Sequence, residues 1–144
     1  EKIYELLKQE RSLGKISYAV SSVASSVIDR KGITFAIRKA LANSLRMLKL
    51  NSTDCDVLLD GGLRAPEEFE NQRTIIKGDE KEAVIALASV VAKVTRDAMM
   101  KSFALKYPQY DFEIHKGYGT RNHYRKIRMH GLSDIHRKSF LKDF

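Results

Sequence analysis

The sequence has few of the features that mark secreted and membrane proteins. Cys55 is the only cysteine among 144 residues, so no disulfide can form within the chain, as is usual for proteins of the reducing cytosol. The residues from Glu1 to Tyr4 are already amphipathic and do not follow the pattern of a signal peptide. No apolar run approaches the length of about 20 residues that a transmembrane helix needs. We therefore expect a cytoplasmic protein.

Internal repeats, low-complexity tracts and linkers are also absent from the sequence. Hydrophobic residues make up 43% of the chain and charged residues 31%, which is the composition of a folded globular protein rather than a disordered one. A length of 144 residues is enough for one domain with a real core. We expect residues 1–144 to form a single domain and the protein to be a monomer.

Positive charge is concentrated toward the end of the chain. Residues 98–144 hold 10 Lys or Arg and 4 Asp or Glu, a net charge of +6, whereas residues 1–97 hold 16 and 14, a net charge of +2. A basic region of this kind suits a polyanion such as a nucleic acid. The same surplus could serve solubility alone, so charge by itself leaves both interpretations open.

Hydrophobic periodicity predicts an α/β layered domain. Apolar residues recur at helical spacing in three segments, which are residues 1–11, 33–48 and 79–105. A last helix is predicted near residues 121–130, with Thr120 or Asn122 as its cap and Gly131 at its end. Alternating or continuous apolar runs bounded by turn residues predict three strands, near residues 16–24, 55–60 and 73–77. Strands that alternate with helices are typical of a sheet with helices packed on it.

Two aspartates follow predicted strands at the point where each strand ends. Asp60 ends the apolar run that begins at Val57, and Asp79 lies just after Ile76, where a long helix begins. If the two strands are parallel neighbours, both carboxylates emerge at the same edge of the sheet, where ligands of α/β proteins bind. Two carboxylates there would suit Mg²⁺ or Mn²⁺. The simpler interpretation is that Asp79 only caps its helix.

Five segments of the chain carry a family resemblance in their order and spacing. They are residues 57–61 (VLLDG), 77–81 (KGDEK), 88–97 (ASVVAKVTRD), 115–120 (HKGYGT) and 135–140 (IHRKSF). Over nearly the whole chain, the sequence resembles the C-terminal part of ribonuclease HII, the type 2 ribonuclease H. The fold that this resemblance implies is the ribonuclease H-like mixed sheet flanked by helices. A helical, basic, substrate-binding region over about residues 101–144 would complete it.

The activity that the resemblance implies is metal-dependent endonucleolytic hydrolysis of RNA. The substrates would be RNA–DNA hybrids and duplex DNA with embedded ribonucleotides. Cleavage would fall 5′ of the ribonucleotide and leave a 3′-hydroxyl, with Mg²⁺ or Mn²⁺ as the cofactor.

The family's active site has four carboxylates, and the motifs place the third and fourth on Asp60 and Asp79. The first two form an adjacent Asp-Glu pair in an Asp-Glu-Ala-Gly-Arg-Gly motif, which this sequence does not contain. We therefore expect residues 1–144 to lack the first strands of the domain. We also expect this chain alone to be inactive, because two of the four site carboxylates are missing.

Tyr118 is a candidate substrate-binding residue. It stands between two glycines, and residues 115–128 hold five Lys or Arg, including Lys116 and Arg121, and no acidic residue. An aromatic ring can pack on a sugar or base while cations neutralise phosphates. The resemblance implies that this ring lies beside the nucleotide next to the cleaved ribonucleotide. Alternatively, Tyr118 fills the core beneath the last helix.

Other polar residues allow two interpretations each. Lys77 lies beside Asp79 and could steady a phosphate or be merely solvated. Lys93 could face a phosphate or pair with Asp97, which shares its helical stripe, and we interpret Arg96 and Asp97 as a structural ion pair. The four histidines, His115, His123, His130 and His136, lack zinc-site spacing, so we expect them at the surface or the edge of the core.

A functional alternative of a different class follows from the charge distribution. The basic C-terminal third could make this chain a nucleic-acid-binding module without catalytic activity. A third possibility is an α/β subdomain in which the aspartates are only helix caps. The presence or absence of the Asp-Glu strand in the complete protein distinguishes these alternatives from the nuclease.

Overall fold

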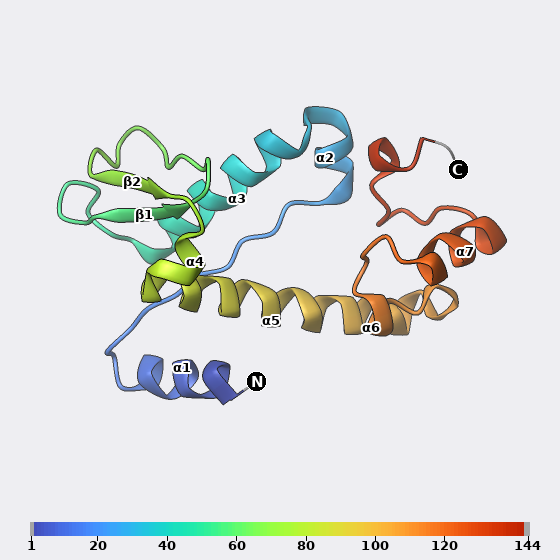
Figure 1. Cartoon of the computed structure of the whole chain (residues 1–144), viewed down its shortest axis with the longest axis horizontal. Coiled ribbons are helices and arrows are strands. Elements are labelled where there is room, and N and C mark those ends of the chain that lie inside the picture. The colour runs from blue at the N-terminus through green and yellow to red at the C-terminus, as the bar shows by residue number, and fades with distance from the viewer. Residues whose placement is uncertain (1, 143–144) are drawn as a thin grey trace.

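The computed structural model describes residues 2–142 and has an α/β architecture (Figure 1). Its α-helices are α1 (Lys2–Ser12), α2 (Ser25–Lys31), α3 (Ile33–Leu48), α4 (Gly78–Lys81), α5 (Ala83–Lys106), α6 (Phe112–His115) and α7 (Arg121–His130). The strands are β1 (Val57–Asp60) and β2 (Gln72–Ile75), and two 3₁₀ turns are η1 (Pro108–Tyr110) and η2 (Lys138–Phe140). The predicted fold class is therefore confirmed.

The sheet consists of β1 and β2, which pair in parallel, with Val57 opposite Gln72 and Asp60 opposite Ile75. The side chains of Val57 and Leu59 are buried on one face of β1, as the period of two along a strand requires. They join a small core with three other buried residues, Leu45 of α3, Ala65 and Phe69. This core fixes the strands against α3 and so sets the position of their carboxyl ends.

The helix predicted over residues 79–105 is present but broken near its start. Glu82 has an extended backbone, with φ −124° and ψ 117°, and separates the single turn of α4 from α5. The break lets α4 contact the end of β1 while α5 continues to Lys106. Figure 1 shows α5 crossing the molecule from the sheet to α6 and α7.

A second core lies at the far end of α5. Tyr110, Phe112 and Ile127 are almost fully buried there and pack against Met100 and Phe103 of α5. The hydroxyl of Tyr110 donates to the carbonyl of Gly131 at 2.7 Å, which satisfies the polar end of an otherwise apolar side chain. This core holds α7 and the segment after it on α5.

Helical periodicity identifies α3, and the cap residues Thr120 and Gly131 identify α7, with the bounds that the structure shows. The first helix is also confirmed, from Lys2 to Ser12, and Glu1 lies outside the described residues. Two short helices, α2 and α6, are unexpected. They span seven and four residues, too few for periodicity to register.

The strand predicted near residues 16–24 is wrong. These residues carry no strand assignment and connect α1 to α2 without pairing with either strand. Tyr18, Val20 and Val23 are each partly buried, but so are Ala19 and Ser21 between them, so burial does not alternate as in a strand. A strand also needs a hydrogen-bonded neighbour, and within residues 2–142 β1 and β2 pair only with each other.

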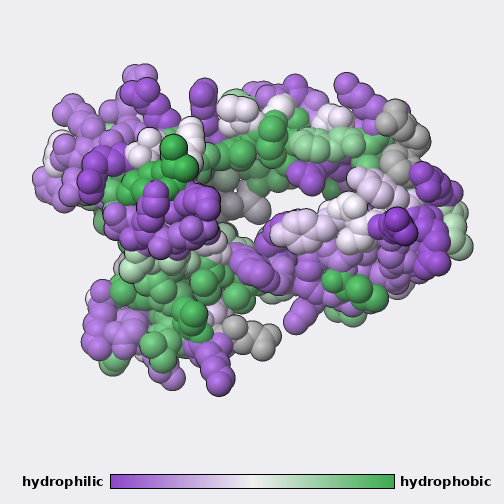
Figure 2. All heavy atoms as spheres, viewed as in Figure 1, coloured by the Kyte–Doolittle hydropathy of each residue, from purple (hydrophilic) through white to green (hydrophobic). Residues whose placement is uncertain are grey.

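The surface is divided between apolar and polar regions. Figure 2 shows hydrophobic side chains gathered over α1 and the start of α5, and hydrophilic side chains over α7. Ile3, Leu6, Ile76 and Val84 are among the exposed apolar residues. Within residues 2–142, no helix is both long and apolar enough to cross a membrane.

Candidate active site

Asp60 and Asp79 follow the carboxyl ends of neighbouring parallel strands, as the sequence predicts. Asp60 is the last residue of β1 and lies opposite Ile75, the last residue of β2. Two residues later Lys77 adopts a left-handed backbone conformation, with φ 54°, which turns the chain into α4. Asp79 is the second residue of that helix, and the side chains of both aspartates are exposed. The sheet edge therefore presents two carboxylates to solvent.

A hydrogen bond joins the first of these aspartates to the helix that carries the second. The backbone N–H of Gly78 donates to Oδ1 of Asp60 at 2.8 Å. A Cβ atom at position 78 would lie 2.6 Å from Cδ1 of Ile85 and 3.4 Å from Oδ1 of Asp60. Glycine at position 78 therefore leaves room for the Ile85 side chain of α5, and the bond fixes the orientation of the Asp60 carboxylate.

The basic residues beside the aspartates make local contacts. Nζ of Lys77 lies 3.6 Å from Oε1 of Glu80, and both side chains are exposed. Lys81 donates through Nζ to the carbonyl of Ile76 at 2.9 Å. An exposed ion pair contributes little stability, so Glu80 holds Lys77 only weakly.

Tyr118 lies in a second region, beside the middle of α5. Its side chain is 59% exposed, so the alternative in which it fills the core beneath the last helix is wrong. The guanidinium carbon of Arg96 lies 4.4 Å from the centroid of the Tyr118 ring, within the range of a cation–π contact. Nη2 of Arg96 also donates to the carbonyl of Lys116 at 3.0 Å. Arg96 thus holds the ring and the backbone before it.

Arg96 and Asp97 do not act as the ion pair that we expected from the sequence. Oδ2 of Asp97 pairs with Nζ of Lys93 at 2.8 Å, while Arg96 extends to Tyr118. The hydrogen bond from Lys93 lowers the pKa of Asp97, and the bond to Asp97 raises the pKa of Lys93. Of the two interpretations of Lys93, the structure shows the pair with Asp97.

Lys116, on the loop before α7, and Arg121, at the start of α7, flank Tyr118 in the sequence. The loop ends at Thr120, whose side chain accepts a hydrogen bond from the backbone N–H of His123 at 3.2 Å and caps the helix. Arg121 is the first residue of α7 and is exposed. Lys116 has a left-handed backbone, with φ 50°, and its ammonium group bonds the carbonyl of Glu113. Basic residues therefore stand both before and after the aromatic residue in the sequence.

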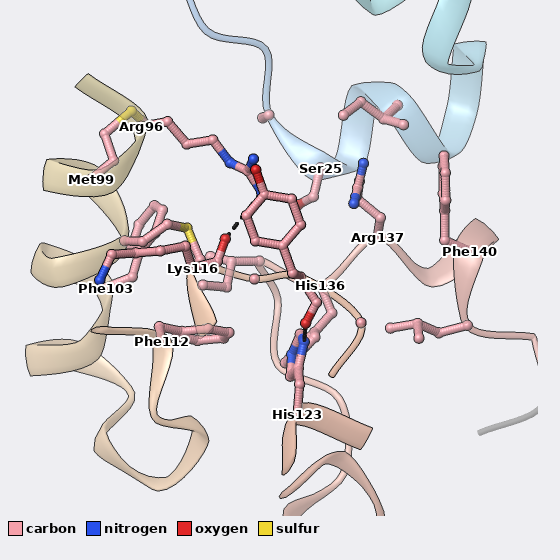
Figure 3. A pocket seen from close by; sticks show the side chains of 18 of the residues that line it. Ser25, Arg96, Met99, Phe103, Phe112, Lys116, His123, His136, Arg137 and Phe140 are labelled. Carbon is pink, nitrogen blue, oxygen red and sulfur yellow. Dashed lines mark hydrogen bonds between the residues drawn. The ribbon is translucent and has the colours of Figure 1, made fainter. Parts of the chain in front are cut away.

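An open cavity of about 950 Å³ lies next to the Tyr118 loop. Arg96 of α5, Tyr118, His136 and Arg137 are among the residues that line it. Figure 3 shows Arg96 on one wall of this cavity and His123 and Arg137 on another. Asp60 and Asp79 are not among the lining residues. The structure thus groups the candidate residues into a carboxylate edge and an aromatic loop, with Lys93 on the helix between them.

Three histidines are buried, contrary to the expectation that they lie at the surface or the edge of the core. His115, His123 and His136 are 6%, 6% and 5% exposed, whereas His130 is exposed. Burial lowers the pKa of His123, and burial together with the nearby His123 lowers the pKa of His136 to about 4. The ring nitrogens of these histidines form hydrogen bonds within the protein. A search for the spacing of zinc ligands in the sequence therefore could not identify them.

Comparison with known proteins gives a consistent result. The family described as Ribonuclease HII matches residues 1–143. A ribonuclease HII of Caldicellulosiruptor bescii is 43% identical over 143 residues, covering 99% of this chain and 66% of the relative. One from Clostridium beijerinckii is 44% identical over 141 residues, covering 98% and 50%. The chain thus spans about half to two thirds of the length of these relatives.

The buried His136 predicts that the protein loses stability as the pH falls from about 6.5 to about 4. In this window histidines of the unfolded chain bind protons while His136 of the folded protein stays neutral, so acid favours unfolding. The glutamine of His136→Gln cannot titrate. Between these two pH values, the unfolding free energy of this variant should therefore fall by roughly 1–3 kcal/mol less than that of the unmodified protein.

Denaturant unfolding at the two ends of this pH range measures the difference. The matched control is His130→Gln, on the surface of α7, which should keep the pH slope of the unmodified protein. An equal slope in His136→Gln and in the unmodified protein would contradict the assignment of a neutral, buried His136.

Proposed function

Because the chain belongs to the ribonuclease HII family, we propose that the protein is a divalent-metal-dependent endonuclease that hydrolyses RNA in RNA–DNA hybrids. The proposal extends to single ribonucleotides embedded in duplex DNA, with cleavage 5′ of the ribonucleotide and a 3′-hydroxyl product. Residues 1–144 supply two of the four carboxylates that the resemblance implies. The activity is therefore proposed for the protein that also carries the Asp-Glu pair.

The observation that carries this proposal is the parallel pairing of β1 and β2, which puts Asp60 and Asp79 at one edge of the sheet. Both side chains are exposed and offer hard oxygen ligands. Mg²⁺ is commonly held by one or two carboxylates together with water and substrate phosphates, so this donor set fits Mg²⁺ or Mn²⁺. When bound, such an ion would supply Lewis-acid stabilisation of charge on the phosphate.

The protein's own residues orient the scissile phosphate at this edge. Asp60 is held by Gly78, so one carboxylate oxygen has a fixed direction before substrate arrives. Lys77 lies two residues before Asp79 on an exposed turn. Its ammonium group balances the negative charge of a phosphate brought close to the two carboxylates. Asp60 would thus orient the phosphate, and Lys77 would balance its negative charge.

The aromatic loop supplies binding and position. Arg96 contacts the ring of Tyr118, which is 59% exposed, so ring surface is available to a nucleotide sugar. Lys116 and Arg121 on either side would neutralise adjacent phosphates. A duplex substrate would then contact the carboxylate edge and the loop together, along α5. Placement of the sugar by Tyr118 would set where the strand is cut.

Asp60→Asn in the full-length gene product should abolish hybrid cleavage at every Mg²⁺ concentration. The fold should persist, because an asparagine Oδ1 can still accept the hydrogen bond from Gly78 that Asp60 accepts. A gel assay of a labelled RNA–DNA hybrid, with thermal melting of each variant, measures both effects. The matched control is Asp56→Asn, an exposed residue just before the start of β1.

Activity close to that of the unmodified protein in Asp60→Asn would refute the assignment of Asp60. A full-length product that binds the hybrid but cleaves nothing at any metal concentration would favour the non-catalytic binding module instead.

Replacement of Tyr118 should separate ring contact from hydroxyl contact. Tyr118→Phe keeps the aromatic face and most of the activity, whereas Tyr118→Ala should lose roughly 1–3 kcal/mol of binding or transition-state energy. The melting temperature should change little in either variant, because the side chain is exposed. Cleavage kinetics and thermal melting of both variants test this. Normal specific activity in Tyr118→Ala would exclude the substrate role.

A further inference from the structure

Helix α7 and the segment after it meet in a buried pair of histidines. His123 stands on α7, just after the segment 115–120, and His136 belongs to the segment 135–140. Their Nε2 atoms are 3.1 Å apart, and both side chains are buried. Two nitrogens at this distance share one proton, so one ring donates and the other accepts. The remaining contacts determine the direction.

The hydrogen bonds define a single chain that ends on Tyr118. The backbone N–H of Ser133 lies 3.0 Å from Nδ1 of His136, and the hydroxyl of Ser133 lies 2.7 Å from the same nitrogen. A hydroxyl can donate or accept, but a backbone N–H can only donate, so this nitrogen is an acceptor and neutral His136 carries its proton on Nε2. Nε2 of His123 must then accept, which leaves the proton of neutral His123 on Nδ1. That N–H donates to the carbonyl oxygen of Tyr118 at 3.0 Å.

The surroundings of the pair favour the neutral forms that this chain requires. His115 stacks on His123 with ring centroids 4.1 Å apart, and the rings of Tyr110 and Phe112 lie against His136. His115 accepts at Nδ1 from the N–H of Gly117, and its Nε2 lies 2.6 Å from the carbonyl oxygen of Tyr110. Burial lowers the pKa of both His123 and His136, in agreement with this pattern.

The segment that contains His136 is anchored to α2, at the other end of the series of hydrogen bonds. The carboxylate of Asp29 in α2 accepts from the backbone N–H groups of Lys138 and Ser139 at 3.0 and 2.9 Å. The hydroxyl of Ser25 donates to the carbonyl of Asp134 at 3.1 Å. The backbone is thus held on both sides of His136. Through His123, this fixed histidine is hydrogen-bonded to the carbonyl of Tyr118 in the loop.

We propose that His136 and His123 are positioning residues, which hold the backbone of Tyr118 in the place where its ring can contact the substrate. Arg96 holds the loop from α5 and the histidine pair holds it from α7 (Figure 3). The proposal rests on the proposed function, because it assumes that Tyr118 contacts the nucleic acid. Neither histidine touches substrate in this account.

A double-mutant cycle in the full-length gene product tests the proposal. His136→Phe keeps the ring shape and removes the hydrogen bonds, and it should lower kcat/KM for hybrid cleavage about 3- to 10-fold, as loss of one hydrogen bond would. His136→Gln can still donate to Nε2 of His123 and should retain most activity. In a Tyr118→Ala background, His136→Phe should cause no further loss. Activities are normalised to the folded fraction at each temperature.

The outcomes separate the two proposals. If Tyr118→Ala alone leaves cleavage unchanged, the proposed role of Tyr118 fails, and this inference fails with it. If Tyr118→Ala lowers cleavage but His136→Phe adds its whole effect in that background, only the positioning role is overturned. The positioning role is also overturned if His136→Gln loses as much activity as His136→Phe.

A second measurement does not depend on whether a variant folds. Nitrogen-15 chemical shifts of the imidazole rings in the unmodified protein report which nitrogen is protonated. At neutral pH the proposal requires a proton on Nδ1 of His123 and on Nε2 of His136. The opposite tautomer in either ring, or a charged ring, would break the chain to Tyr118 and overturn the inference.

Discussion

The parallel pairing of β1 with β2 is the constraint on which the candidate active site depends. Register pairs Asp60 with Ile75, so the chain leaves both strands at the same edge of the sheet. The left-handed turn at Lys77 then brings the first residues of α4 back toward β1. A charge-assisted hydrogen bond from Gly78 to Asp60 closes this arrangement at 2.8 Å. With antiparallel strands, the two aspartates would follow opposite edges.

Helix α5 connects this edge to a region of opposite charge. Its first turns lie against the sheet, and its middle carries Arg96, which orders the Tyr118 loop. Carboxylates at one end attract cations, whereas the basic residues of the loop and α7 attract phosphates. The buried histidines add a structural element between the two motifs near the C-terminus, and their neutrality makes the loop geometry sensitive to acid. Rigid positioning rather than one deep cavity thus characterises the site.

Sequence patterns predict the elements whose own residues determine them. Fifteen or more residues of sustained periodicity predict α3, and the apolar runs before Asp60 and Asp79 predict the two strands, whose parallel pairing the structure shows. Features that depend on partners elsewhere were not predictable in this way. Residues 16–24 alternate like a strand but pair with neither strand of the described sheet, and the extended backbone at Glu82 breaks a continuous helical pattern. The burial of His136 and the reach of Arg96 to Tyr118 likewise depend on distant contacts.

The central claim is that Asp60 and Asp79 hold one divalent ion. Titration of the full-length gene product with Mn²⁺, followed by NMR line broadening of backbone amides, tests it most directly. The account predicts that the amide signals of Asp60, Gly61, Gly78 and Asp79 broaden together at the lowest Mn²⁺ concentrations and recover when the ion is chelated. Broadening at only one of the two aspartates, or first at the acidic segment 67–70, would contradict a shared site.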